Sequence, residues 1–465
     1  MSTVPLKEGQ KDASYTYDST PGNDPVDEYA YVKTGEDARE FRDVFWMILF
    51  YLHLAAVLVA VIINIVEEEE AEEVESVSSG IRLLFSVTAL SAIVISTGAL
   101  AMMSCCLNEM IKAGLLFSVF MSLLVGMFGI LNGQFWIGLF GIFSFLVGAC
   151  YAKLVWSKIP FAEANLKTAL VAVKANWGLG VFAYSMIILA YAWSVFWFMG
   201  FGDAIDRGNW GLLVGLLFSY YWVFNVLFNT LVVTTIGTVG TWWVAPEEAN
   251  SCCSQGFRDS LFRSTTYSFG SICLGSLLVA FIQALRALVG SVKNNEDCTC
   301  LACILDCFLG CIEGALEYLN KWAYAFVGLY GMNYVEAGRS VFELFETKGW
   351  SSIISDDLCD RVLELICVGV GLLTGLIGVL FAYSDDQLLE ALDLGDYEKL
   401  DAFFIGLIIG LVFSSILMSV VGAGVNAVIV CFCDSPQEFE ANHPELSLEM
   451  RDAWVLAWPE LVIFE

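Results

Sequence analysis

Between residues 44 and 432 the chain consists of one apolar stretch after another, each about as long as a bilayer is thick. Hydrocarbon offers the backbone no hydrogen-bond partner, so a run of roughly 20 apolar residues is stable there only as a helix. The composition agrees, since 58% of the 465 residues are hydrophobic and only 16% are charged. The sequence therefore predicts an all-α integral membrane protein, a polytopic transmembrane helical bundle with about ten spans.

The ten predicted spans are residues 44–66, 81–107, 114–132, 134–156, 176–200, 210–243, 268–288, 313–335, 360–383 and 402–432. The eighth is the least apolar, because Glu317, Asn320 and Lys321 lie near its start, and a re-entrant or interfacial helix fits it as well. Residues 1–40 have no apolar period and are expected to form a disordered tail. Residues 433–465 are expected to form a second tail.

The charges indicate an orientation. Lys and Arg are concentrated in the links after the fourth, sixth and eighth spans, whereas acidic residues crowd the links after the first span and before the tenth. Because cytoplasmic loops are enriched in Lys and Arg, both tails are predicted to be cytoplasmic. The first span begins too late and is too long for a signal peptide, so it is expected to be an uncleaved anchor. The net charge of −29 argues against nucleic acid as a partner.

Residues that would support enzyme chemistry are scarce. The chain has only two histidines, His53 and His443, and no Gly-Lys dipeptide. A histidine-rich metal centre and an ATPase phosphate loop are therefore not expected, and the sequence predicts no catalytic residue, no metal and no cofactor.

One group of cysteines leaves several interpretations open. The group is Cys298, Cys300, Cys303, Cys307 and Cys311. The last four repeat at intervals of three and four, which places them on one face of a helix. A metal site, acylation at the membrane edge, disulfides and a small-residue packing face all remain possible interpretations.

The sixth span carries a polar and aromatic stripe. In a helix, Tyr221, Asn225 and Asn229 stand on one face at intervals of four, with Trp222 beside them. An unpaired amide is costly in hydrocarbon, so both asparagines must face another helix or a wet cavity. Interhelical bonding is the alternative to a binding role. Gln283 in the seventh span is likewise expected at a cavity or in a supporting contact.

Small residues mark where helices approach closely. Ser264, Ser268, Ser271 and Gly275 form such a stripe, and glycine pairs four residues apart occur at 371 and 375 and at 406 and 410. Gly and Ser let membrane helices pack closely, so these stripes predict helix contacts and not binding sites.

Longer motifs resemble a known family. The run SFGSICLGSLLVAFIQALRAL at 268–288 closely resembles the signature helix of the choline transporter-like family. The motifs SYYW at 219–222, GTWW at 240–243, NKWAYAFVGLYGMNYVEAGRSVFELF at 320–345 and VCFCDSPQEFEANHPEL at 430–446 match in the same order. The resemblance covers about residues 176–454. The short link at 67–80 and the lack of an Asn-X-Ser/Thr sequon look like the compact fungal and protist branch, the pH-nine-sensitive type.

The resemblance implies ten transmembrane helices, cytoplasmic ends and passage of choline or related amines. Residues 44–432 are then a transporter domain of a multi-pass protein, expected in the plasma membrane. We expect it to move choline or a related organic cation by alternating access without ATP. Two alternatives stay open: a membrane protein that handles choline lipids, for which His53, Glu313, Glu317 and Lys321 are the ionisable candidates, and a non-transporting scaffold or sensor.

The expected substrate suggests which residues bind it. A quaternary ammonium group cannot donate hydrogen bonds, and proteins hold it by cation–π contacts, each worth about 2 kcal/mol or more when desolvated. The substrate hydroxyl would instead use an amide. The predicted substrate-binding residues are the rings of Tyr221, Trp222, Trp322 and Tyr330 and the amides of Asn225, Asn229, Gln283 and Asn333.

Overall fold

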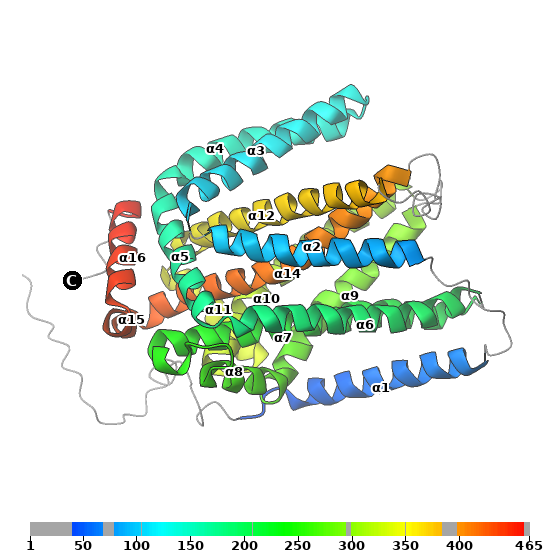
Figure 1. Ribbon diagram of the computed structural model, residues 1–465, viewed down its shortest axis with the longest axis horizontal. Helices are drawn as coiled ribbons and strands as arrows, with labels where there is room; N and C mark the ends of the chain where they lie inside the picture. The colour runs from blue at the N-terminus through cyan, green and yellow to red at the C-terminus, as the bar shows by residue number, and fades with distance from the viewer. Residues whose placement is uncertain are drawn as a thin grey trace, which may run out of the picture.

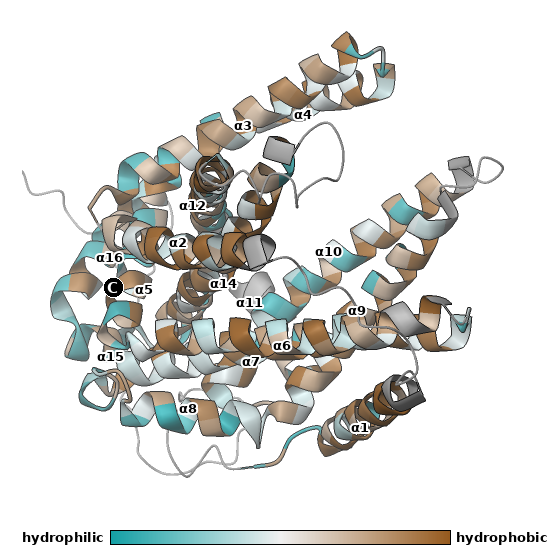
Figure 2. Cartoon of the chain, turned by 45° about the vertical axis from the view of Figure 1, so that its right-hand side comes forward, coloured by the Kyte–Doolittle hydropathy of each residue, from teal (hydrophilic) through white to brown (hydrophobic). Residues whose placement is uncertain are grey.

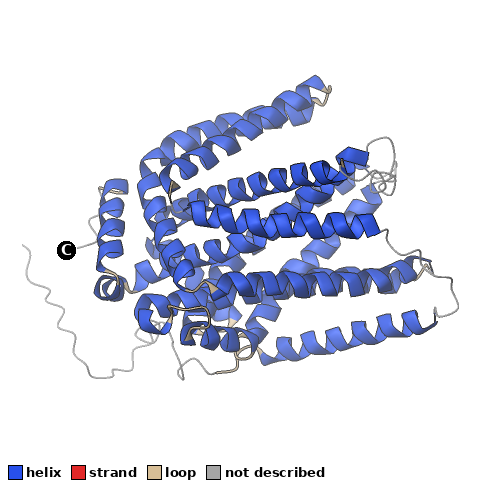
Figure 3. Cartoon of the chain, in the orientation of Figure 1, coloured by secondary structure: helices blue, strands red, loops and turns tan. Residues whose placement is uncertain are grey.

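The computed structural model describes residues 40–67, 79–103, 105–206, 208–293, 299–348, 350–383 and 398–459. These residues are helical almost throughout and contain no β-strand, which confirms the all-α prediction (Figure 3). The predicted N-terminal tail, apart from Glu40, lies outside the described residues. Most of both acidic links also lies outside them.

A helix occupies each of the ten predicted spans. They are α1 (Val44–Glu67), α2 (Ser79–Met103), α3 (Leu107–Leu131), α4 (Phe135–Val155), α6 (Gly178–Asp206), α7 (Trp210–Val244), α9 (Phe269–Lys293), α10 (Thr299–Tyr330), α12 (Trp350–Ala382) and α14 (Glu398–Asp434). Most of them begin and end within a few residues of the prediction. The exceptions are α10 and α12, which begin well before it, because polar residues that interrupt an apolar run do not interrupt a helix.

Nine stretches of the described chain are long and apolar enough to cross a membrane, and α10 is not among them. Its 32 residues include Asp306, Glu313, Glu317 and Lys321. The predicted eighth span, 313–335, is also wrong at its end, since the helix stops at Tyr330. Gly331 follows with φ +67°, a left-handed conformation that glycine adopts without strain and that commonly ends helices.

The long helices lie side by side, and shorter ones gather at one end of them (Figure 1). These shorter helices are α5 (Ile159–Ala175), α8 (Gln255–Thr265), α11 (Tyr334–Lys348), α15 (Pro436–Asn442) and α16 (Pro444–Ala457). A short 3₁₀ turn at Trp156–Lys158 joins α4 to α5, and α5 packs against α14 and α16. The predicted C-terminal tail thus contains two helices, α15 and α16, with His443 between them.

The end that carries α5 and α8 also carries basic residues of the predicted basic links. Lys158 precedes α5, Lys167 and Lys174 lie on it, and Arg258 lies on α8. The opposite end of the bundle holds the end of α1 and the beginning of α2 (Figure 1). Several basic residues of the predicted links thus lie at one end of the bundle, whereas most of both acidic links lies outside the described residues.

Glycines bring α12 and α14 into close contact. A Cβ added to Gly410 would lie 2.8 Å from the Cα of Gly371, and one added to Gly406 would lie 3.0 Å from the Cα of Gly375. The close approach predicted from these glycine pairs is confirmed. A similar contact joins α3 to α4, where a Cβ on Gly141 would meet the Cα of Gly126 at 2.4 Å.

Hydrophobic residues make up much of the long helices (Figure 2), and many of their apolar side chains are exposed. On the α3–α4 hairpin, which diverges from the other helices in Figure 1, Phe128 is 67% exposed and Phe140 is 71% exposed. Water would disfavour so much exposed hydrocarbon, whereas a bilayer accommodates it. The protein is a multi-pass membrane protein.

Candidate functional site

A chain of polar side chains links α7, α9 and α10. Asn225 on α7 donates one amide hydrogen to the backbone oxygen of Tyr221 and the other to Oε1 of Gln283 on α9, both at 2.8 Å. The amide nitrogen of Gln283 points in turn to Oε1 of Glu317 on α10, at 3.4 Å. The predicted residues Tyr221, Asn225 and Gln283 are therefore neighbours, and the structure adds Glu317 to them.

Further charges lie beside this chain. Arg286, one turn after Gln283 on α9, pairs with Asp306 at 3.1 Å and with Glu313, both on α10. Glu317 interacts electrostatically with the same guanidinium and with Glu313. Three carboxylates therefore lie near one guanidinium, and this part of the bundle carries surplus negative charge. Tyr221 belongs to the same environment, since its hydroxyl interacts electrostatically with Glu313 and Arg286.

We refer to Tyr221, Asn225, Gln283 and Glu317 as the amide–carboxylate site. Tyr221, Asn225 and Gln283 are half-buried and Glu317 is exposed, so a ligand can reach the carboxylate. The first three residues lie within stretches that are able to cross a membrane. Polar and ionisable groups are expensive at that depth and usually have a functional role.

Asn229 lies one turn from this site and is closed off from it. It donates a hydrogen bond to Oγ of Ser276 on α9 at 2.9 Å and is 8% exposed. The hydroxyl of Tyr324 on α10 lies 3.5 Å from the same serine oxygen. Asn229 thus joins helices, the role that the sequence analysis held open for it.

Trp222 points away from the amide–carboxylate site. Its ring packs among His53, Phe50 and Phe218, with ring centroids 4.7, 5.2 and 5.7 Å away. Its Nε1 donates to the backbone oxygen of Cys273 at 3.1 Å, and the residue is 2% exposed. Side chains of the protein already cover the ring that was predicted to hold an ammonium group.

The three remaining predicted residues also lie apart. Trp322 is fully buried within α10, and Tyr330 donates to Oδ2 of Asp434 at 2.5 Å. Asn333 follows α10, and its Oδ1 accepts a hydrogen bond from the backbone nitrogen of Glu336 at 2.9 Å in the first turn of α11. The eight predicted residues therefore do not form one cage.

The acidic residues of the site had a recognisable signal in the sequence. Asp306, Glu313, Glu317 and Lys321 are spaced by seven, four and four residues, which places them on one face of a helix. The sequence analysis named only the last three. It used Glu317 and Lys321 as polar residues near the start of the eighth span, and all three as ionisable candidates for a protein that handles choline lipids.

Lys321 continues this polar face of α10 toward α12. Its ammonium group lies 2.6 Å from a carboxylate oxygen of Asp356 and 2.6 Å from one of Asp360. Asp356 is 2% exposed, so this ion pair is deeply buried. Breaking such a pair leaves a buried charge uncompensated and is strongly destabilising.

The cysteine group is only partly described. Cys298 and the side chain of Cys300 lie outside the described residues, whereas Cys303, Cys307 and Cys311 are free and exposed on α10. These three form neither a disulfide nor a packing face within the described chain. In that same part, no cluster of His, Cys, Asp and Glu has the geometry of a metal site.

Comparison with known proteins identifies what the chain is similar to. A family model described as plasma-membrane choline transporter matches residues 136–437, which include all eight predicted residues and Glu317. The chain is 29% identical over 337 residues to Protein PNS1 of Gibberella zeae, covering 67% of this chain and 61% of that protein. It is 27% identical over 340 residues to a CTL-like protein of Dictyostelium discoideum, covering 70% and 58%.

A third relative, Protein PNS1 of Mycosarcoma maydis, is 32% identical over 244 residues, which cover 51% of this chain and 45% of the relative. The chain thus spans about half to three fifths of the length of these relatives. Two of the three are fungal PNS1 proteins, in agreement with the branch that the sequence motifs resemble.

Proposed function

Because the chain belongs to the plasma-membrane choline transporter, or choline transporter-like, family, we propose that it carries choline or a related small cationic amine across a membrane. The observation that supports this proposal most directly is the surplus negative charge beside Tyr221, Asn225 and Gln283. We propose alternating access as the mechanism, without ATP. Both alternatives, a protein that handles choline lipids and a non-transporting scaffold, predict no choline flux through the purified protein.

The cationic group of the substrate would be held by charge. A trimethylammonium group has no hydrogen to donate, so it gains from a nearby carboxylate through Coulomb attraction and from an aromatic face through cation–π contact. Glu317 offers the carboxylate, since its only hydrogen bond among the described residues is the long one from Gln283. Tyr221 offers the aromatic ring. Glu313 is less available, because Arg286 already pairs with it.

The hydroxyl of the substrate would use the amides. Asn225 donates both of its amide hydrogens to Tyr221 and Gln283, which leaves its Oδ1 to accept a hydrogen bond. Choline carries its hydroxyl two carbons from the ammonium nitrogen, so one ligand can engage the carboxylate and this amide together. An amine without a hydroxyl would leave that oxygen unpaired.

The orientation is proposed on the same basis as in the sequence. The end of the bundle with α5 and α8 carries Lys158, Lys167, Lys174 and Arg258, and basic residues favour the cytoplasmic side. We propose that this end and both termini are cytoplasmic and that the protein resides in the plasma membrane.

The test is uptake of labelled choline into vesicles that contain only this protein. We expect saturable uptake that unlabelled choline inhibits. The neutral carbon isostere of choline, with a tert-butyl group in place of trimethylammonium, should not inhibit it. Glu317→Gln should raise the half-saturation concentration for choline about tenfold, which corresponds to about 1.4 kcal/mol. The exposure of Glu317 keeps the expected effect well below that of a buried charge pair.

The matched control is Glu109→Gln, which removes an exposed carboxylate on α3 that pairs with Lys112. It should leave the half-saturation concentration unchanged. Absence of uptake by the folded wild-type protein would contradict the proposed transport. Uptake with equal affinity in both variants would contradict the role of Glu317 alone.

A further inference from the structure

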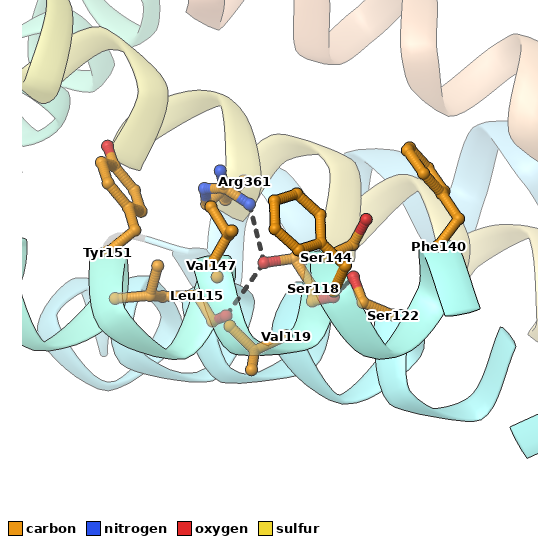
Figure 4. A pocket seen from close by; sticks show the side chains of 11 residues that line it. Leu115, Ser118, Val119, Ser122, Phe140, Ser144, Val147, Tyr151 and Arg361 are labelled. Carbon is orange, nitrogen blue, oxygen red and sulfur yellow. Dashed lines mark hydrogen bonds between the residues drawn. The ribbon is translucent and has the colours of Figure 1, made fainter. Parts of the chain in front are cut away.

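A cavity lies between α3, α4 and α12 and shares no residue with the amide–carboxylate site. It has a volume of about 340 Å³. Its walls combine Ser118, Ser122, Ser144, aromatic rings that include Tyr151, and the guanidinium of Arg361, which points into it from α12 (Figure 4). The proposed transport mechanism does not involve these residues, so their role needs a separate explanation.

Arg361 is held in place with part of its hydrogen-bonding capacity unused. Its Nε and Nη2 donate to the carboxylate of Asp357 at 2.9 and 3.2 Å, and its Nη1 donates to Oγ of Ser118 at 2.7 Å. A guanidinium has five N–H groups. Two of these N–H groups therefore have no partner among the described residues. Both belong to the guanidinium that points into the cavity.

Of the three serines, only Ser144 adds a donor to the cavity. Ser118 and Ser122 donate to the backbone oxygens of Leu115 and Ser118, at 2.9 and 3.1 Å, so they keep only acceptor capacity. The hydroxyl of Ser144 has no hydrogen-bond partner in the described part of the chain and remains a donor. Free N–H groups of an arginine beside a free hydroxyl suit the oxygens of a phosphoryl group, which Arg binds well.

Acidic and aromatic groups lie next to these donors. Asp357 also accepts a hydrogen bond from the hydroxyl of Tyr151 at 2.7 Å, and the guanidinium carbon of Arg361 lies 5.5 Å from the centre of the Tyr151 ring. Asp357 neutralises Arg361, and Glu364 lies close enough to interact with Arg361 electrostatically. A ligand with surplus negative charge is therefore disfavoured, whereas one that carries both a phosphate and a cation matches the cavity.

The position of the cavity fits the headgroup of a lipid. The apolar part of α12 begins at Ser355. Arg361 lies six residues further, or about 9 Å along the helix. Tyr151 lies one turn from the end of α4. Both residues are thus near the boundary between hydrocarbon and water. Beyond the cavity α3 and α4 expose apolar side chains, such as Phe128 and Phe135, along which acyl chains can lie.

We propose that this cavity binds the headgroup of a zwitterionic glycerophospholipid. Its phosphate accepts hydrogen bonds from Arg361 and Ser144, and its cationic amine lies against Asp357 and the ring of Tyr151. The acyl chains follow the outer faces of α3 and α4. The cavity lies where the α3–α4 hairpin meets α12, so the bound lipid holds the hairpin against the bundle.

The test uses the full chain in lipid nanodiscs with a photoactivatable phosphatidylcholine, whose attachment sites are mapped by mass spectrometry. We expect labelling on residues 115–122 and 140–151. Arg361→Gln should reduce this labelling about tenfold, since it removes a charge-assisted contact to phosphate. Ser144→Leu fills the cavity without touching the Arg361–Asp357 pair, so it should reduce labelling even if Arg361→Gln fails to fold. Lys112→Gln, which removes a half-buried cation on α3 outside the cavity, should have no effect.

Competition separates the possible ligands. Unlabelled phosphatidylcholine should displace the probe, whereas inorganic phosphate, choline and phosphatidylglycerol should not. Displacement by inorganic phosphate would mean a site for free anions, and displacement by choline would assign the cavity to the transported substrate. Stronger displacement by phosphatidylglycerol would contradict the zwitterionic headgroup. Equal labelling of wild type and Ser144→Leu would overturn the site itself.

Discussion

The indole nitrogen of Trp222 donates a hydrogen bond to the backbone oxygen of Cys273, 3.1 Å away, and this bond joins α7 to α9. Tyr221, the preceding residue, lies about 100° away around α7, in a polar environment with Glu313 and Arg286. Two aromatic residues that are adjacent in sequence therefore have different surroundings, one within a closed packing contact and the other beside an accessible carboxylate.

The first prediction follows from this difference. Trp222→Leu removes a buried ring and its hydrogen bond, so it should lower the free energy of unfolding by about 2–3 kcal/mol, within the usual range for large-to-small changes. The half-saturation concentration for choline should not change, because the ring is already covered. Thermal unfolding and vesicle uptake measure the two effects. Trp136→Leu, at a position that is 77% exposed, is the matched control and should alter neither. A tenfold loss of affinity at normal stability would instead place Trp222 in the substrate site.

The second prediction concerns recognition of the hydroxyl. Asn225→Leu should weaken choline about tenfold relative to ethyltrimethylammonium, which lacks the hydroxyl, because only choline loses a hydrogen-bond partner. Asn229→Leu is the control, since its amide bonds to Ser276 and should affect both amines alike. Competition of each amine with labelled choline gives the two affinities. Equal weakening of both amines by Asn225→Leu would mean that this amide only supports the packing of α7 and α9.

The third prediction tests the contact between α12 and α14. Gly410→Ala places a methyl group 2.8 Å from the Cα of Gly371, so it should destabilise the bundle by about 1–3 kcal/mol through overpacking. Gly369→Ala, on α12 with nothing within 4 Å of the new methyl group, should be neutral or stabilising. The difference in melting temperature between the two variants is the measurement. Two variants that melt together would show that the helices separate at little cost.

The fourth prediction concerns pH. His443, between α15 and α16, stacks on Trp242 with ring centroids 3.8 Å apart, and its Nε2 lies 3.0 Å from the backbone oxygen of Trp242. Burial lowers the pKa of His443, and the hydrogen bond to Trp242 opposes this only in part. The folded protein therefore binds a proton less readily than the unfolded chain, whose histidine has a pKa of about 6.5. The stability that neutral His443 contributes is lost as the pH falls below that value.

The measurement is the melting temperature at neutral and at mildly acidic pH, for wild type and for His443→Phe, which keeps the stacking but cannot titrate. We expect wild type to lose more stability on acidification than the variant does. Parallel losses in the two proteins would assign the pH dependence to other groups.

The fifth prediction concerns orientation. A cysteine placed at Asn132, in the turn between α3 and α4, should react with an impermeant thiol reagent added outside intact cells. One placed at Lys167 on α5 should react only after the cells are opened. Labelling of the wild-type protein is subtracted, because Cys105 and other native cysteines are exposed. Labelling of position 167 from outside would invert the proposed topology.

The sequence by itself determined the membrane class, nine of the ten long helices and the close approach of α12 to α14. Each depends on a property of the chain that acts locally: an apolar run long enough to span hydrocarbon, or glycines spaced on one helix face. The end of α10 was placed wrongly, because the hydropathy around it continues smoothly while Gly331 adopts a left-handed backbone conformation.

Tertiary structure alone decided which side chains meet. Tyr221, Asn225 and Asn229 share a helix face in the sequence, but only the packing of α9 against α7 and α10 pairs Asn225 with Gln283 and Asn229 with Ser276. The same packing places Glu317 beside Gln283, 34 positions away in the chain. A helical period specifies the face on which a residue lies, whereas the neighbour opposite that face depends on how helices cross. Sequence motifs were therefore sufficient to indicate the family. The separation of Trp222 from the amide–carboxylate site became visible only in the tertiary structure.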